Sequence, residues 1–90
     1  MITSACVRFY LKNDATMYEI PCHRHADAFE IISQFISMDA IDKTKTKQGF
    51  LTHENIFLDR YEAMQEAIKW NQLLHKTDEV YAELYSEDLW

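Results

Sequence analysis

The chain has very few residues that give the backbone extra conformational freedom or interrupt regular secondary structure. It contains one glycine and one proline in 90 residues, and it has neither a P-loop nor a glycine-rich dinucleotide loop. Because a Cβ keeps neighbours away elsewhere, Gly49 is one of few places where a ligand or a second strand can approach the backbone closely. Gly-x-Ser-x-Gly and His-Glu-x-x-His motifs are also missing. We therefore expect no enzymatic activity and no cofactor.

Long apolar runs and an export signal are absent as well. No stretch approaches the roughly 18 apolar residues of a membrane helix, and the N-terminus lacks a basic segment followed by an apolar one. The two cysteines, Cys6 and Cys22, flank an expected hairpin, and a chain that is not secreted usually keeps its thiols reduced. We expect an intracellular protein without a membrane partner.

Acidic residues outnumber basic ones, and the excess lies late in the chain. The formal net charge is −6; residues 1–60 hold seven Lys and Arg against eight Asp and Glu, whereas residues 61–90 hold two against seven. Such a chain repels a polyanion, so DNA and RNA are poor partners. A compact anion bound at one local group of cations is still compatible with this composition.

The apolar pattern of the first half predicts a hairpin followed by a helix. Alternation predicts strands over 5–11 and 17–22, and Pro21 either ends the second strand or confines it to a sheet edge. Helical spacing then predicts a helix from about residue 28 to 36. Its expected apolar positions are Ala28, Phe29, Ile31, Ile32, Phe35 and Ile36.

The second half repeats this order. A basic, aperiodic segment at 39–47 is expected to be a flexible surface loop, and strands at 48–52 and 56–58 precede a second helix. The expected buried stripe of that helix is Ala63, Met64, Ala67, Ile68 and Leu74. We predict a single α+β domain, in which an antiparallel β-sheet from two hairpins carries both helices on one face. The aromatic, acidic tail at 80–90 is expected to add an edge strand or to cross to a partner subunit.

Both helix starts carry an Asp-x-x-Glu signal, which is the spacing of a capping box. Asp27 with Glu30 marks the first helix, although His25 is an alternative start one turn earlier. Asp59 with Glu62 marks the second helix.

The first candidate binding residues precede the first helix. Arg24 and His25 lie where free N–H groups and the helix dipole favour an anion. A solvated loop with a capping histidine is the plainer interpretation. A zinc site using Cys22 and His25 is disfavoured, because the paired ligand spacing of structural zinc is absent.

The second group surrounds the glycine. Phe50 is a candidate for stacking on a base, and Thr52 for bonding a ribose or a phosphate. The alternative places Phe50 in the core and makes Gly49 a site of close strand packing. Arg60 follows a helix cap, where it would clamp a phosphate or pair with a surface carboxylate.

Several blocks of the chain together resemble a known family of small phage proteins. The blocks are Arg24-His25, Gln48–Thr52, Phe57–Ala63, Gln72 and the ending Leu84–Trp90. They are similar to the first type of Thoeris anti-defence protein. The resemblance implies a sponge that sequesters a cyclic ADP-ribose signal without cleaving it, in the cytoplasm of the infected bacterial host. It also implies a homo-oligomer, a dimer or a hexamer, and in some members a separate site for cyclic oligonucleotides.

Matching positions carry ligand roles over to this chain. The residues so implied are Arg24, His25, Phe50, Thr52, Arg60, Ser86, Glu87 and Asp88. The chain departs from the family pattern at Asn71 and in the turn 53–55, where glycine is expected, and at Ile56, where arginine is expected. Two rival hypotheses are a protein-interaction module that uses the acidic second half, and a small hydrolase of the same ligand.

Overall fold

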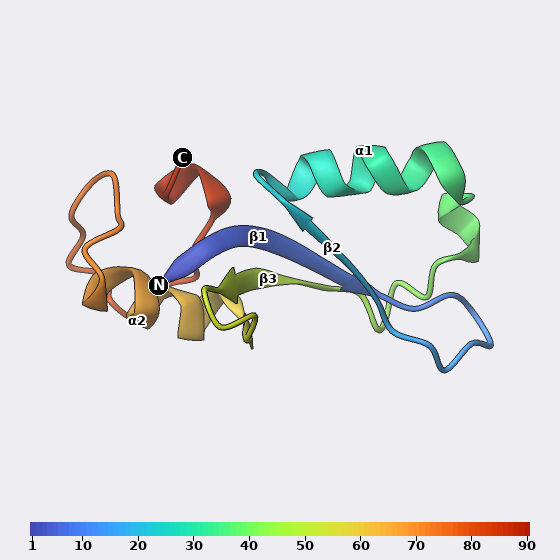
Figure 1. The fold of residues 1–90 in the computed structure, drawn as a ribbon, viewed down its shortest axis with the longest axis horizontal. Coiled ribbons are helices and arrows are strands. Elements are labelled where there is room, and N and C mark those ends of the chain that lie inside the picture. Colours follow the sequence, from blue (N-terminus) through green and yellow to red (C-terminus); the bar gives the residue numbers. More distant parts are fainter.

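The computed structural model describes residues 1–90 and shows two hairpins joined into one sheet (Figure 1). The strands are β1 (Ile2–Phe9), β2 (Tyr18–Cys22), β3 (Lys47–Thr52) and β4 (Phe57–Leu58). They lie in the order β2-β1-β3-β4, and each neighbouring pair is antiparallel. The predicted α+β fold with a four-stranded antiparallel sheet is confirmed.

Two helices cover opposite ends of this sheet. They are α1 (His25–Phe35) and α2 (Arg60–Lys69), and two 3-10 turns are η1 (Met38–Ala40) and η2 (Ser86–Asp88). Ala5 packs in a core with α2, and Val7 packs in a second core with α1. Because side chains alternate along a strand, Ala5 and Val7 belong to one face of β1. The molecule is elongated, 40 × 23 × 21 Å, with α1 and α2 toward different ends (Figure 1). None of the helices has the length and apolarity needed to cross a membrane.

The two predicted capping boxes have different outcomes. Asp59 accepts hydrogen bonds from the backbone N–H of Glu62 at 2.8 Å, and the Glu62 carboxylate accepts from the Asp59 N–H at 3.0 Å. The box at Asp27 and Glu30 is wrong, and the alternative start one turn earlier, at His25, is confirmed. Burial of the His25 ring ties the start of the helix to β3, and this tertiary contact overrides the local signal.

Both helices bury fewer of their apolar side chains than the sequence pattern predicted. On α1, Ile31 and Phe35 are 43 % and 80 % exposed, although both were expected in the core. Ile68 is also exposed, and Leu74 lies beyond the end of α2, where Asn71 adopts a left-handed φ of 53°. An asparagine tolerates that conformation and lets the chain leave the helix.

The C-terminal tail contributes apolar side chains to the core beside α2. Leu84 is fully buried and Leu89 is 7 % exposed, and both join Phe50 in the core beside α2. The segment forms the turn η2 and not the expected edge strand. The predicted tail is therefore part of the core of its own domain.

The basic loop is anchored at its beginning. Ile41 is buried beneath α1, and backbone hydrogen bonds join Lys12 to Ala40 and Asp42 to Tyr10, each at 2.8 Å. The flexibility expected over 39–47 stays a prediction.

The two thiols lie on opposite faces of the sheet. Cys6 pairs with Pro21 in the strand register, whereas Cys22 pairs with Ala5. Both cysteines are free, and burial raises the pKa of the Cys6 thiol to about 12.

Candidate functional site

Three blocks that lie far apart in the sequence meet around the C-terminal turn. Arg24 donates from Nη2 to the backbone oxygen of Trp90 at 2.5 Å, and its Nη1 lies 3.5 Å from a carboxylate oxygen of Glu87. From the other side, Arg60 donates from Nη1 to the backbone oxygen of Leu84 at 2.7 Å. The two candidate cations therefore hold the same short segment from two helix N-termini.

His25 is a buried structural residue at the centre of this region. Its Nε2 donates to the backbone oxygen of Gly49 at 2.7 Å, and its ring meets the Phe50 ring edge-on at a centroid distance of 5.1 Å. Because a carbonyl oxygen only accepts, Nε2 carries the proton in this bond. Burial lowers the pKa of His25, with the charge of Arg60 acting in the same direction. This lowered pKa favours the neutral imidazole, so the geometry gives no support to a cationic role.

Phe50 and Thr52 are also committed to the fold. Phe50 is fully buried, so its ring offers no face to a base unless the core opens. Thr52 is 6 % exposed, and its hydroxyl accepts hydrogen bonds from the backbone N–H groups of Glu54 and Ile56. Thr52 ends β3 and shapes the turn to β4, at the opposite end of the strand from Lys47.

The single glycine provides room for a neighbouring strand. A Cβ at Gly49 would lie 2.8 Å from Cε2 of Phe57 and closer still to the backbone oxygen of Leu58. The Phe57 ring is held in place by the Arg8 guanidinium, 4.1 Å from the ring centroid. Gly49 has no positive φ, so glycine is required here for space alone. The interpretation of Gly49 as a point of close strand packing is confirmed.

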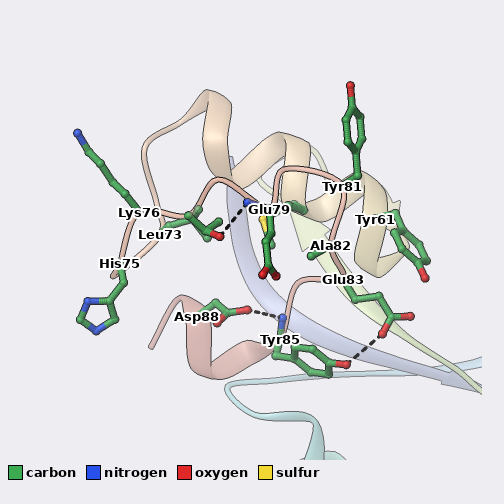
Figure 2. A pocket seen from close by; sticks show the side chains of 12 residues that line it. Tyr61, Leu73, His75, Lys76, Glu79, Tyr81, Ala82, Glu83, Tyr85 and Asp88 are labelled. Atoms are coloured by element: carbon green, nitrogen blue, oxygen red, sulfur yellow. Dashed lines mark hydrogen bonds between the residues drawn. The ribbon is translucent and has the colours of Figure 1, made fainter.

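The hollowed surface of this region lies beside Arg60. Two adjoining hollows of about 650 and 640 Å³ share Tyr61, Glu83 and Tyr85, and the first of them is drawn in Figure 2. The second hollow adds cations and polar groups from β3 and from the start of α2. These additional residues are Thr46, Lys47, Gln48, Phe57, Asp59 and Arg60. Each hollow has the size of a small-molecule site.

Hydrogen bonds and ring contacts hold the charged and aromatic side chains at the wall that the two hollows share. The Arg60 guanidinium lies 4.7 Å from the centroid of the Tyr85 ring, and its Nη2 donates to the side chain of Gln48 at 2.6 Å. The Arg60 guanidinium therefore makes two of the five hydrogen bonds that its N–H groups can donate, to Leu84 and to Gln48. The Tyr85 hydroxyl donates to the Glu83 carboxylate at 3.0 Å, and this bond raises the pKa of Tyr85. The charge of Glu83 also raises the pKa of Tyr61.

The remaining predicted residues have separate places. Ser86 is buried, and its hydroxyl donates to Glu87 at 3.2 Å. Glu87 is exposed and faces Arg24. Asp88 accepts from the backbone N–H of Tyr85 at 2.9 Å and lines the hollow of Figure 2. No three His, Cys, Asp or Glu side chains gather in a metal-binding arrangement.

Sequence reasoning missed the aromatic and acidic wall of the hollow. Tyr81, Glu83 and Tyr85 alternate with Ala82 and Leu84, and only the latter two pack against the core. This period of two is the signal that could have identified an extended segment with one outward face.

Fold and site together define a small, single-domain α+β protein with a tyrosine-lined hollow next to an arginine. The chain belongs to the phage T4 y16D protein family, whose model matches residues 1–90. This match confirms the expectation of a phage protein, and the family it names is not the Thoeris anti-defence family. No curated protein and no solved structure matches the chain.

Proposed function

We propose that this phage protein is a non-catalytic sponge that binds and sequesters a cyclic ADP-ribose-type signalling nucleotide. The observation that carries the proposal is the hollow beside Arg60, where a guanidinium, two tyrosine rings and a carboxylate share one wall. A cyclic ADP-ribose molecule presents a pyrophosphate, an adenine ring and ribose hydroxyls. The hollow offers a group of the matching kind for each of them.

The parts of the ligand are assigned by chemistry. Arg60 and Lys47 supply positive charge for the pyrophosphate. Tyr61 is 56 % exposed and Tyr85 is 47 % exposed, so their rings can stack on adenine. The Glu83 carboxylate is an acceptor for ribose hydroxyls. This assignment keeps the kinds of contact expected from sequence but replaces Phe50 by surface tyrosines.

Retention without turnover is the property to test. The purified protein is mixed with cyclic ADP-ribose, the free ligand is separated by ultrafiltration, and the protein is then denatured by heat. We expect ligand to be missing from the first filtrate and recovered intact after heating. Ligand that passes freely into the first filtrate contradicts binding, and recovery of a linear product indicates the hydrolase instead.

Variants locate the site. Arg60→Gln and Tyr85→Ser are expected to weaken ligand affinity by about fivefold or more, because each removes a charged or stacking contact worth roughly 1–3 kcal/mol. Lys12→Gln, an exposed cation in the β1–β2 turn, is the matched control and should retain ligand as the native chain does. We also propose a homo-oligomer, which native mass measurements with and without the ligand will test.

The rival function, a protein-interaction module, has one specific observation in its favour. Tyr81 is 85 % exposed in the acidic half of the chain. Deletion of 80–90 would not isolate this function, because it would remove Leu84 and Leu89 from the core. Tyr81→Ser is the cleaner variant: loss of a protein partner with nucleotide retention intact would favour the rival.

A further inference from the structure

A basic hollow lies between the β1–β2 turn and the segment that leads into β3 (Figure 1). Its volume is about 490 Å³, which is within the range of small-molecule sites. Three of its seven lining residues are cations, Arg8, Lys45 and Lys47, and none is acidic. The chain as a whole carries a net charge of −6, so this local surface differs in sign from the rest of the molecule.

Two of the cations face each other across neighbouring strands. Arg8 on β1 is the direct partner of Lys47 on β3 in the strand register. Because Val7 packs in the core beneath α1, its neighbour Arg8 belongs to the opposite face of the sheet, and Lys47 shares that face. Like charges directly opposite each other destabilise a strand pair. An anion bound beside both side chains would relieve this repulsion.

The carboxylate of Glu19 neutralises one of the three cations. Glu19 is the partner of Arg8 on β2 and accepts a hydrogen bond from Arg8 Nε at 2.7 Å. Since β1 lies between β2 and β3, this contact is on the side of Arg8 away from Lys47. Three cations and one carboxylate leave an excess of two positive charges at the hollow.

The two aspartates near the hollow are hydrogen-bonded to other groups. Asp42 accepts from the backbone N–H of Thr44 at 3.0 Å and from its hydroxyl at 2.6 Å. The bond from the Thr44 side chain lowers the pKa of Asp42, and the charge of Lys45 acts in the same direction. Asp14 accepts from the backbone N–H of Thr16 at 2.8 Å. No ion pair joins a lysine of the hollow to any carboxylate.

We propose that this hollow binds an oligophosphate chain, whose adjacent phosphate groups contact Lys45, Lys47 and the Arg8 guanidinium. The ammonium group of Lys45 lies 5.6 Å from the centroid of the Tyr10 ring, and this contact holds its charge at the hollow. Exposed charge pairs are individually weak, so cations from three positions favour a chain of several phosphates over a single one. The proposal uses neither Arg60 nor the tyrosine wall, although Lys47 borders both hollows.

Inorganic triphosphate is the probe. The full-length protein is titrated with sodium triphosphate in a calorimeter at fixed ionic strength, and sodium sulfate is the comparison anion. We expect saturable binding of triphosphate at least about tenfold tighter than that of sulfate, which weakens as added salt screens the charges. A parallel titration with ATP identifies the source of the chain: tighter binding than triphosphate indicates a nucleotide, and equal binding indicates the inorganic chain.

Matched variants assign the site. Lys45→Gln is expected to weaken triphosphate binding by about threefold or more. Lys43→Gln removes another exposed lysine of the same segment, which does not line the hollow, and should bind as the native chain does. Arg60→Gln should also keep the native affinity for triphosphate. Its effect on cyclic ADP-ribose is measured separately, so failure of this proposal and failure of the proposed function are distinguishable.

The repulsion between the two strands gives a second measurement. Lys47→Gln removes one member of the like-charge pair, so the melting temperature without ligand should rise. The further rise that triphosphate causes should be smaller in this variant than in the native chain. A lysine that serves only the fold would instead lower the melting temperature when it is replaced.

Three results would overturn the proposal. The first is triphosphate binding no tighter than sulfate binding. The second is an equal loss of affinity in Lys43→Gln and Lys45→Gln, which would mean diffuse attraction to the basic segment. The third is a loss in Arg60→Gln with native affinity in Lys45→Gln, which would place the phosphate chain in the hollow beside Arg60.

Discussion

Replacing the only glycine by alanine is a direct test of the close packing between β3 and β4. In an ordinary strand, Gly49→Ala would stabilise the protein by roughly 0.5–1 kcal/mol, because alanine loses less backbone entropy on folding. Here the new Cβ would lie 2.8 Å from Cε2 of Phe57 and nearer to the backbone oxygen of Leu58, inside the 3.0 Å that real Cβ atoms respect. A backbone oxygen in a sheet cannot move aside easily. We expect a net loss of about 1–3 kcal/mol in the free energy of unfolding.

Urea unfolding followed by circular dichroism measures this loss. Phe57→Ala removes the ring from the clash but leaves the Leu58 oxygen, so the double variant should be less destabilised than the sum of the single variants, by about 0.5 kcal/mol or more. Nucleotide affinity per folded molecule should not change in Gly49→Ala. A stability equal to or above that of the native chain would refute the packing argument, and a selective loss of nucleotide binding would place a ligand against Gly49.

The remaining predictions concern the core, the helix caps and pH. Leu84→Ala should lower the free energy of unfolding in urea by about 2–5 kcal/mol, because the side chain is fully buried; a loss below about 1 kcal/mol would mean that the tail does not pack as described. Asp59→Ala should lower it by about 1–2 kcal/mol through loss of the capping box, and Asp27→Ala by less than about 1 kcal/mol; equal effects would contradict this difference. The pKa of His25 is lowered from 6.5 in the folded protein. The stability that the neutral His25 contributes is therefore complete above that pH and is lost as pH falls below it. As pH falls below about 6.5, stability should fall by at most about 1.4 kcal/mol per pH unit, and His25→Gln should flatten this slope; an unchanged slope would exclude the histidine.

The layout of the fold follows from local signals in the sequence. The alternation around Val7 and the box at Asp59 are each patterns within a few neighbouring residues, and both have the predicted outcome. For the start of α1 the sequence offered two alternatives, and the choice of His25 depends on its bond to Gly49, 24 residues later. The exposure of Phe35 likewise depends on where the rest of the chain lies.

The sequence predicted the types of residue at the candidate site but not the surface on which they lie. Arg60 was identified from its place after a helix cap, and it does border a hollow. Phe50 was chosen as the aromatic contact because it follows the glycine, yet its ring faces the core. Tyr85 belongs to the same sequence block, Leu84–Trp90. Only the packing of Leu84 in the core shows that its neighbour Tyr85 faces outward.

The central claim is that a cyclic nucleotide binds in the hollow beside Arg60. Titration of isotope-labelled protein with cyclic ADP-ribose, followed by amide chemical shifts, tests it most directly. We predict saturable shifts confined to the β3 start and the segments around Arg60 and Glu83, and their loss in Arg60→Gln but not in Lys12→Gln. No shifts at millimolar ligand, or shifts confined to the β1–β2 turn, would contradict the claim.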